Sequence, residues 1–132
     1  MEKTKITPPG SAEIMGKYSH GLKVDIGDTD LIFVTGQIAM DENGNVVSED
    51  ITEQTEYVFQ SIQKILNAAG SSLDDVVKAS IFVTNMDDFK EISKVRNKYF
   101  EKSEPVSTLV EVNKMVKEGI KIEIEVIAAK QK

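Results

Sequence analysis

The sequence predicts an α+β protein in which two helices cover one face of a mixed sheet. Three observations lead to this prediction. Several short apolar stretches alternate as strands do, two longer stretches repeat apolar residues at helical spacing, and the two kinds of stretch interleave along the chain. Within 132 residues, this interleaving favours one layer of helices on one sheet, and we expect residues 1–132 to form a single domain.

Three strands are expected in the first part of the chain. Residues 3–7 form a short edge strand that ends at two prolines, since proline cannot donate to a ladder. Residues 22–26 alternate in polarity, and residues 31–38 are apolar on both faces, which is typical of a strand covered on both sides. An Asn-Gly pair within residues 41–45 predicts a turn after the third strand.

Two amphipathic helices follow the turn, separated by a strand. Asp50 and Glu53 have the spacing of a capping box, and an apolar stripe runs from Ile51 to Ala69 before Gly70 ends the helix. A second stripe covers residues 89–99, after an acidic start at residues 85–88.

Three further strands are predicted at residues 76–83, 106–112 and 119–129. In the strand at 76–83, we expect Val77 to share one face with Ala79, Ile81 and Val83. In the last strand, one face is wholly apolar and needs a helix on it, whereas the other combines carboxylates with an isoleucine. The apolar face is Ile122, Ile124, Val126 and Ala128, and the mixed face is Lys121, Glu123, Glu125 and Ile127.

The sheet face without helices is predicted to be an interface. Two helices can cover only one face, and a large exposed apolar surface on a small protein usually marks a contact between subunits. We therefore expect an obligate homo-oligomer. The residues expected on this face are Phe33, Phe82, Leu109 and Ile127, beside Ser107, Glu111, Glu123 and Glu125.

Composition argues against several classes of function. The chain has a formal net charge of −6 and a single arginine, Arg96, so we expect neither nucleic acid nor another polyanion as its main partner. It contains no cysteine, which excludes disulfides and thiolate chemistry. Because no stretch approaches the length of a membrane span, we expect no membrane partner and a cytoplasmic location.

The three acids expected on the helix-free face leave several chemical interpretations open. They could bind a metal ion, act as acid and base, or pair with lysines of a neighbouring subunit. His20 is the one histidine available as a nitrogen ligand, which disfavours a metal site. Glu123 next to apolar side chains would have a raised pKa, as suits a general base. Tyr18 could stack on a planar ligand.

Five segments of the chain carry a family resemblance: residues 16–21, 33–38, 65–70, 76–83 and 121–128. Together they resemble the Rid (YjgF) family of reactive intermediate deaminases. The similarity runs from about residue 12 to residue 130. It implies a chorismate-mutase-like fold, a homotrimer packed through the bare sheet faces, and a ligand cleft between each pair of subunits. It also implies hydrolysis of 2-aminoacrylate and other imines or enamines without a cofactor or metal; the family has also been labelled endoribonuclease.

The resemblance assigns roles to individual residues. Tyr18 matches a tyrosine of the family's cleft, and Thr35 and Gly36 match the small residues at its strand end. Glu123 matches the glutamate that is thought to orient the attacking water. Leu109 stands where the family commonly has a cysteine whose backbone contacts the ligand.

Ser107 departs from the family pattern, which has an arginine at this position. That arginine clamps the substrate carboxylate, and loss of such a contact typically costs about 2–5 kcal/mol. The departure predicts weak activity on 2-aminoacrylate unless another cation, such as Lys17 or His20, replaces the guanidinium.

Three hypotheses follow. The chain is a trimeric deaminase of neutral or cationic imines with Glu123 as the water-holding residue, a non-catalytic trimer that binds a small metabolite or a protein partner in the same clefts, or, least favoured, an RNA-directed nuclease.

Overall fold

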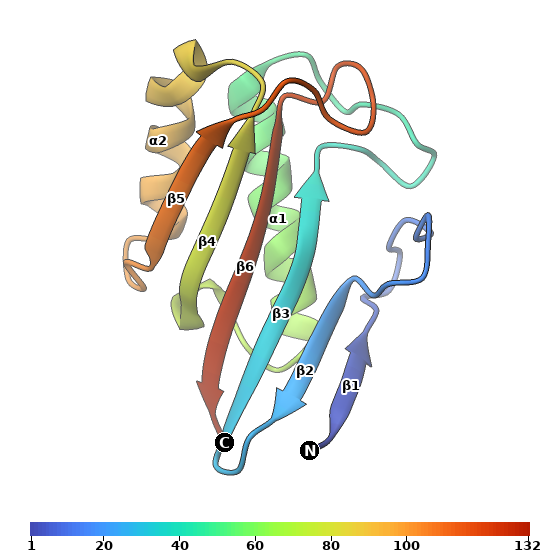
Figure 1. Ribbon diagram of the computed structural model, residues 1–132, viewed down its shortest axis with the longest axis vertical. Coiled ribbons are helices and arrows are strands. Elements are labelled where there is room, and N and C mark those ends of the chain that lie inside the picture. The colour runs from blue at the N-terminus through green and yellow to red at the C-terminus, as the bar shows by residue number, and fades with distance from the viewer.

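The computed structural model describes residues 1–132 and contains one six-stranded mixed sheet with two α-helices on one face (Figure 1). The strand order is β1-β2-β3-β6-β4-β5, and all neighbours are antiparallel except β4 and β5. The α+β prediction is therefore confirmed. The strands are β1 (Lys3–Ile6), β2 (Gly21–Asp25), β3 (Thr29–Ile38), β4 (Val76–Val83), β5 (Val106–Glu111) and β6 (Ile122–Gln131), and the helices are α1 (Ile51–Ala68) and α2 (Phe89–Tyr99). Short 3-10 turns precede β4 (Leu73–Asp75) and α2 (Met86–Asp88).

The core lies between the sheet and the two helices. Figure 1 shows α1 behind β6 and β3, and α2 behind the β4–β5 edge. The predicted apolar face of β6 points into this core, where Ile122, Ile124 and Ala128 are fully buried. Opposite them lies the apolar stripe of α1, with Phe59 and Ile62 also fully buried. β6 therefore lies in the middle of the sheet, where the helix layer covers its wholly apolar face.

A buried glutamine joins the start of α1 to the start of β6. Gln54 is fully buried, and its Nε2 donates to the carbonyls of Ser48 (2.8 Å) and Gly119 (2.7 Å). Its Oε1 accepts from the backbone N–H of Lys121 at 2.9 Å. The side chain satisfies backbone groups from three segments, so it fixes the loop before β6 against the helix layer.

The predicted capping box of α1 is half correct. The Asp50 side chain accepts from the Glu53 backbone N–H at 2.9 Å. The Glu53 carboxylate does not return the bond, because it accepts from the hydroxyl of Ser48 instead. One of the free amides at this helix end is therefore satisfied by a side chain as expected, through a different local network.

The expected face of Val77 in β4 is wrong. Val76 is 2% exposed and Val77 is 47% exposed, so Val76 lies on the core side with Ala79. The cause is a register shift between Val76 and Lys78 in the pairing of β4 with β6. A bulge inserts one residue into a strand without breaking the sheet. A prediction based on strict alternation of side chains cannot detect it.

The expected face of β5 is also wrong. β5 runs parallel to β4, and Ser107, Leu109 and Glu111 are paired with Ala79, Ile81 and Val83, all of which point into the core. Leu109 packs against that core, and the Glu111 carboxylate accepts from the backbone N–H of Met86 at 2.9 Å, just before α2. The helix-free face instead receives Val106, Thr108 and Val110 from β5.

The helix-free face is nevertheless apolar in its middle. Phe33 and Val110 are 39% and 41% exposed, and Ile127 and Phe82 are partly buried. Ile127 pairs with Phe33 on one side and with Lys78 on the other. No helix of the structure is both long enough and apolar enough to serve as a membrane span.

Candidate functional site

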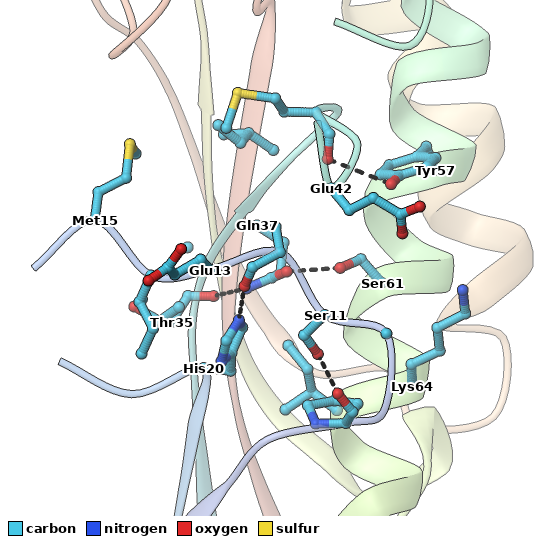
Figure 2. A pocket seen from close by; sticks show the side chains of 18 of the residues that line it. Ser11, Glu13, Met15, His20, Thr35, Gln37, Glu42, Tyr57, Ser61 and Lys64 are labelled. Carbon is cyan, nitrogen blue, oxygen red and sulfur yellow. Dashed lines mark hydrogen bonds between the residues drawn. The ribbon is translucent and has the colours of Figure 1, made fainter. Parts of the chain in front are cut away.

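A cavity of ≈ 470 Å³ opens at the end of β3. β2 pairs with β3 only as far as Val34, and beyond that point the loop before β2 runs beside the free edge of β3. The backbone N–H of Thr35 donates to the carbonyl of His20 at 2.9 Å, which holds the loop there. Figure 2 shows side chains from this loop, from β3 and from α1 around the cavity.

A bulge in β3 shapes the floor of the cavity. The pairing of β3 with β6 passes from Val34–Val126 to Gln37–Ile124, so Thr35 and Gly36 together lie opposite Glu125. Both residues line the cavity. Bulges of this kind redirect side chains and are common beside functional sites.

Gly36 makes room for Glu123. A Cβ atom at Gly36 would lie 2.2 Å from Oε2 of Glu123 and 2.8 Å from its Cδ, so any side chain at this position would displace the carboxylate. Gly36 does not have a positive φ, so the backbone does not require glycine there. The missing side chain serves the position of Glu123, which lines the same cavity.

Glu123 has the electrostatic character of an acid or base. Partial burial raises the pKa of its carboxyl group above the ordinary value, and the neighbouring Glu125 raises it further. A carboxyl group with a raised pKa takes up and returns protons more effectively near neutral pH. The sequence prediction of a raised pKa for Glu123 agrees with this direction.

The loop over the cavity carries Tyr18 and His20. Tyr18 lines the cavity and is 46% exposed. The Nε2 atom of His20 hydrogen-bonds to the carbonyl of Ala12 at 2.8 Å, and its Nδ1 atom is buried without a partner. His20 therefore ties two parts of the loop together, and Figure 2 shows the contact.

Not all of the predicted site residues meet in one chain. Tyr18, Thr35, Gly36 and Glu123 line the cavity, while Ser107 and Leu109 do not. Ser107 and Leu109 lie on the edge strand β5, which β6 and β4 separate from β3, and on the helix side of the sheet. Lys17 is exposed and does not line the cavity either.

Sequence reasoning missed the side of the cavity formed by α1. Tyr57, Gln60, Ser61 and Lys64 line it, and they recur at helical spacing beside the apolar stripe of α1. The Ser61 hydroxyl donates to Oε1 of Gln37 at 2.6 Å, and Nε2 of Gln37 donates to the carbonyl of Thr35 at 3.0 Å. These residues belong to the polar side of the amphipathic helix α1, so no sequence signal distinguished them from ordinary solvent-facing residues.

Acidic residues do not form a metal site in the structure. No group of three or more histidine, cysteine, aspartate or glutamate side chains is arranged to hold an ion.

Comparison with known proteins finds relatives whose similarity extends over nearly the whole chain. The family model described as Endoribonuclease L-PSP matches residues 10–130. A RutC family protein of Pyrococcus abyssi is 39% identical over 132 residues, covering 99% of this chain and 100% of the relative.

Two solved structures show the same fold. The yeast protein YEO7 is 34% identical with a TM-score of 0.88, and the match covers 98% of this chain and 100% of the yeast chain. A protein of the conserved Rid family from Yersinia pestis is 30% identical with a TM-score of 0.85, and the match covers 96% and 98% of the two chains.

Proposed function

This chain belongs to the Rid (YjgF) family, the family of the Endoribonuclease L-PSP model, and from that premise we propose that it hydrolyses imines or enamines to an oxo compound and ammonia. The observation that carries the proposal is the Glu123 carboxyl group, which lies against Gly36 in the cavity and has a raised pKa. Neither a metal ion nor an organic cofactor is needed for this chemistry.

The reaction balances with one water molecule. Glu123 holds the water and accepts a proton as its oxygen bonds to the imine carbon, which gives a tetrahedral carbinolamine. The imine reacts in its protonated form, so the carbinolamine nitrogen is neutral and takes the proton from Glu123. The carbon–nitrogen bond then breaks, ammonia leaves, and the hydroxyl proton passes back to the Glu123 carboxylate as the carbonyl forms. The raised pKa supports both steps, because the same group must act first as a base and then as an acid.

The proposed assembly is a homotrimer with a cleft at each contact between subunits. The apolar helix-free face, with Phe33, Val110 and Ile127 exposed or partly exposed, supports burial against another copy. Ser107 and Leu109 do not line the cavity of their own chain and lie on the edge strand β5, so in this proposal the β5 edge of the neighbouring subunit brings them to the cleft.

Ser107 limits which imines the cleft accepts. A hydroxyl provides one neutral donor, whereas an arginine would provide a charged bidentate clamp for a carboxylate on the carbon next to the imine. Three carboxylates, Glu13, Glu42 and Glu123, line the cavity and repel such an anion. We therefore expect poor turnover of 2-aminoacrylate and better turnover of imines without an acid group beside the reacting carbon.

Ammonia release tests the proposal directly. Freshly generated 2-aminoacrylate and several uncharged imines are mixed with native protein, Glu123→Gln and Ser107→Arg. We expect Glu123→Gln to lose about 100-fold or more of the native rate, and Ser107→Arg to raise the rate on 2-aminoacrylate relative to the uncharged imines. If native protein releases no ammonia above background but binds oxo compounds saturably, the protein is a binding module.

An RNA-directed function is not favoured by the same features. The chain has a net charge of −6 and one arginine, and its cavity is lined by three carboxylates. We expect no salt-dependent binding of single-stranded RNA, which a filter or fluorescence assay at two salt concentrations measures.

A further inference from the structure

The cavity extends past Glu123 to the other side of the sheet. Gly36 and Gln37 are neighbours at the end of the bulge in β3, and their contacts lie on opposite faces of the sheet. Gly36 lies against Glu123 on the helix-free side, whereas the Gln37 side chain reaches Ser61 on α1. All four residues line the same cavity, which passes around the free edge of β3. A ligand that fills the cavity therefore extends from Glu123 toward α1.

Lys64 lies in the α1 part of this cavity. It is the one lysine or arginine among the lining residues, and it sits one helical turn after Ser61. Figure 2 shows it rising from α1 beside the loop that carries Ser11. The carboxylates that line the cavity, by contrast, come from other elements.

The ammonium group of Lys64 has no partner within the chain. It forms no ion pair and no hydrogen bond. Lys64 is exposed, and several exposed lysines, Lys94 among them, likewise have no partner, so the feature that sets Lys64 apart is its place in the cavity lining. An unpaired cation on the wall of a cavity is available to an anionic group of a ligand.

We infer that Lys64 binds an acid group of the ligand that is separated from the reacting carbon by a short chain. The inference rests on the proposed function, which places the imine carbon at Glu123. At that end Ser107 provides no charged clamp, so an acid group on the adjacent carbon is poorly held. At the α1 end a single ammonium group is present, so the favoured substrates are imines with a remote carboxylate.

The test uses stable ketones, so its readout does not require turnover. Levulinate has a carboxylate remote from its ketone, pyruvate has one adjacent, and methyl propyl ketone has none. We expect native protein to bind levulinate more tightly than the other two in calorimetric titrations. In Lys64→Gln the affinity for levulinate falls roughly tenfold, while that for methyl propyl ketone is unchanged. In Lys64→Arg the preference for levulinate remains.

Lys94→Gln is the matched control, because Lys94 is exposed on α2 and does not line the cavity. The Lys94→Gln variant should bind levulinate with the same affinity as native protein at the same salt concentration. The inference is overturned if Lys64→Gln binds levulinate as native protein does, or if it loses affinity for all three ketones equally. Loss of ammonia release in the assay above, with the Lys64-dependent preference intact, would refute the hydrolysis and leave the anion site in place.

Discussion

The two faces of β6 differ in what each needs from the rest of the molecule. Ile122, Ile124 and Ala128 are fully buried under the helices, whereas Glu123 and Ile127 are only partly buried and Glu125 is exposed. One strand therefore provides both the centre of the core and the acid of the candidate site. The core face is completed within the chain, and the other face is not.

This difference separates the side chains that stabilise the fold from those that form the candidate site. A core residue contributes through the apolar area that it removes from water, which depends on close packing with α1. Glu123 instead carries an electrostatic cost, because burial and Glu125 both disfavour its charged form. Groups that are unfavourable for stability and lie in a cavity are expected where chemistry takes place.

The largest effect is expected from shortening a side chain on the core face. Ile124→Ala should lower the free energy of unfolding by about 3–4 kcal/mol, because Ile124 is fully buried and the surrounding core cannot close the space. Denaturant titration measures the change. The control is Glu125→Gln on the exposed face of the same strand, for which we expect a change within about 0.5 kcal/mol. Equal losses in the two variants would contradict the comparison.

A smaller effect is expected when the space for Glu123 is removed. In Gly36→Ala, the new Cβ would fall 2.2 Å from Oε2 of Glu123, so the carboxylate must turn away from the cavity floor. We expect turnover to fall roughly tenfold, since the group is displaced but still present. Steady-state ammonia release measures the loss, and the denaturation midpoint checks that the fold is retained. Unchanged turnover would show that the position of this carboxylate is not needed.

A pH-dependent effect is expected from the raised pKa of Glu123. The folded protein holds the proton of this group more tightly than the unfolded chain, whose pKa lies near 4.5. As pH rises through the folded-state pKa, the ionisation of Glu123 therefore lowers the stability of the folded protein. Below the unfolded-state pKa the group is protonated in both states, so it does not lower stability. Glu123→Gln should gain stability relative to native protein as pH rises above about 4.5. Parallel unfolding curves at acidic and neutral pH measure this, and an opposite trend would mean that Glu123 is paired with a cation.

The smallest effect is expected at Val77. The bulge in β4 places it outside the core, so Val77→Thr should change stability by less than about 0.5 kcal/mol. Val76→Thr is the matched variant on the buried side, where a hydroxyl without a partner costs about 1–3 kcal/mol. Thermal unfolding of the pair measures the difference. A larger cost at Val77 in the assembled protein would indicate that another subunit covers it.

The sequence alone predicted the elements and the general architecture correctly. Some segments have one apolar face, such as residues 122–128 of β6 and the apolar stripe of α1. The spacing of their apolar residues fixes both the secondary structure and the side that is buried. Bulges and edge strands were less predictable. Val77 was placed on the face of Ala79, Ile81 and Val83 because alternation takes no account of the inserted residue. β5 was assigned to the wrong face because its register depends on β4.

The candidate site was predictable only in part. Similarity to known sequences indicated Tyr18, Thr35, Gly36 and Glu123, and these residues line one cavity. The roles assigned to them remain predictions. The cavity wall on α1, including Lys64, was not predicted because its polar side chains look like the solvent-exposed side of an amphipathic helix.

The amino-acid sequence by itself determined which segments are helices and strands, and that two helices would cover one sheet face. These properties follow from local periodicity and residue identity. Only the tertiary structure decided that Gly36 makes room for Glu123 and that Lys64 shares a cavity with both. Those contacts join segments far apart in the chain, and their geometry depends on sheet register and on the bulge in β3, which local sequence patterns do not specify.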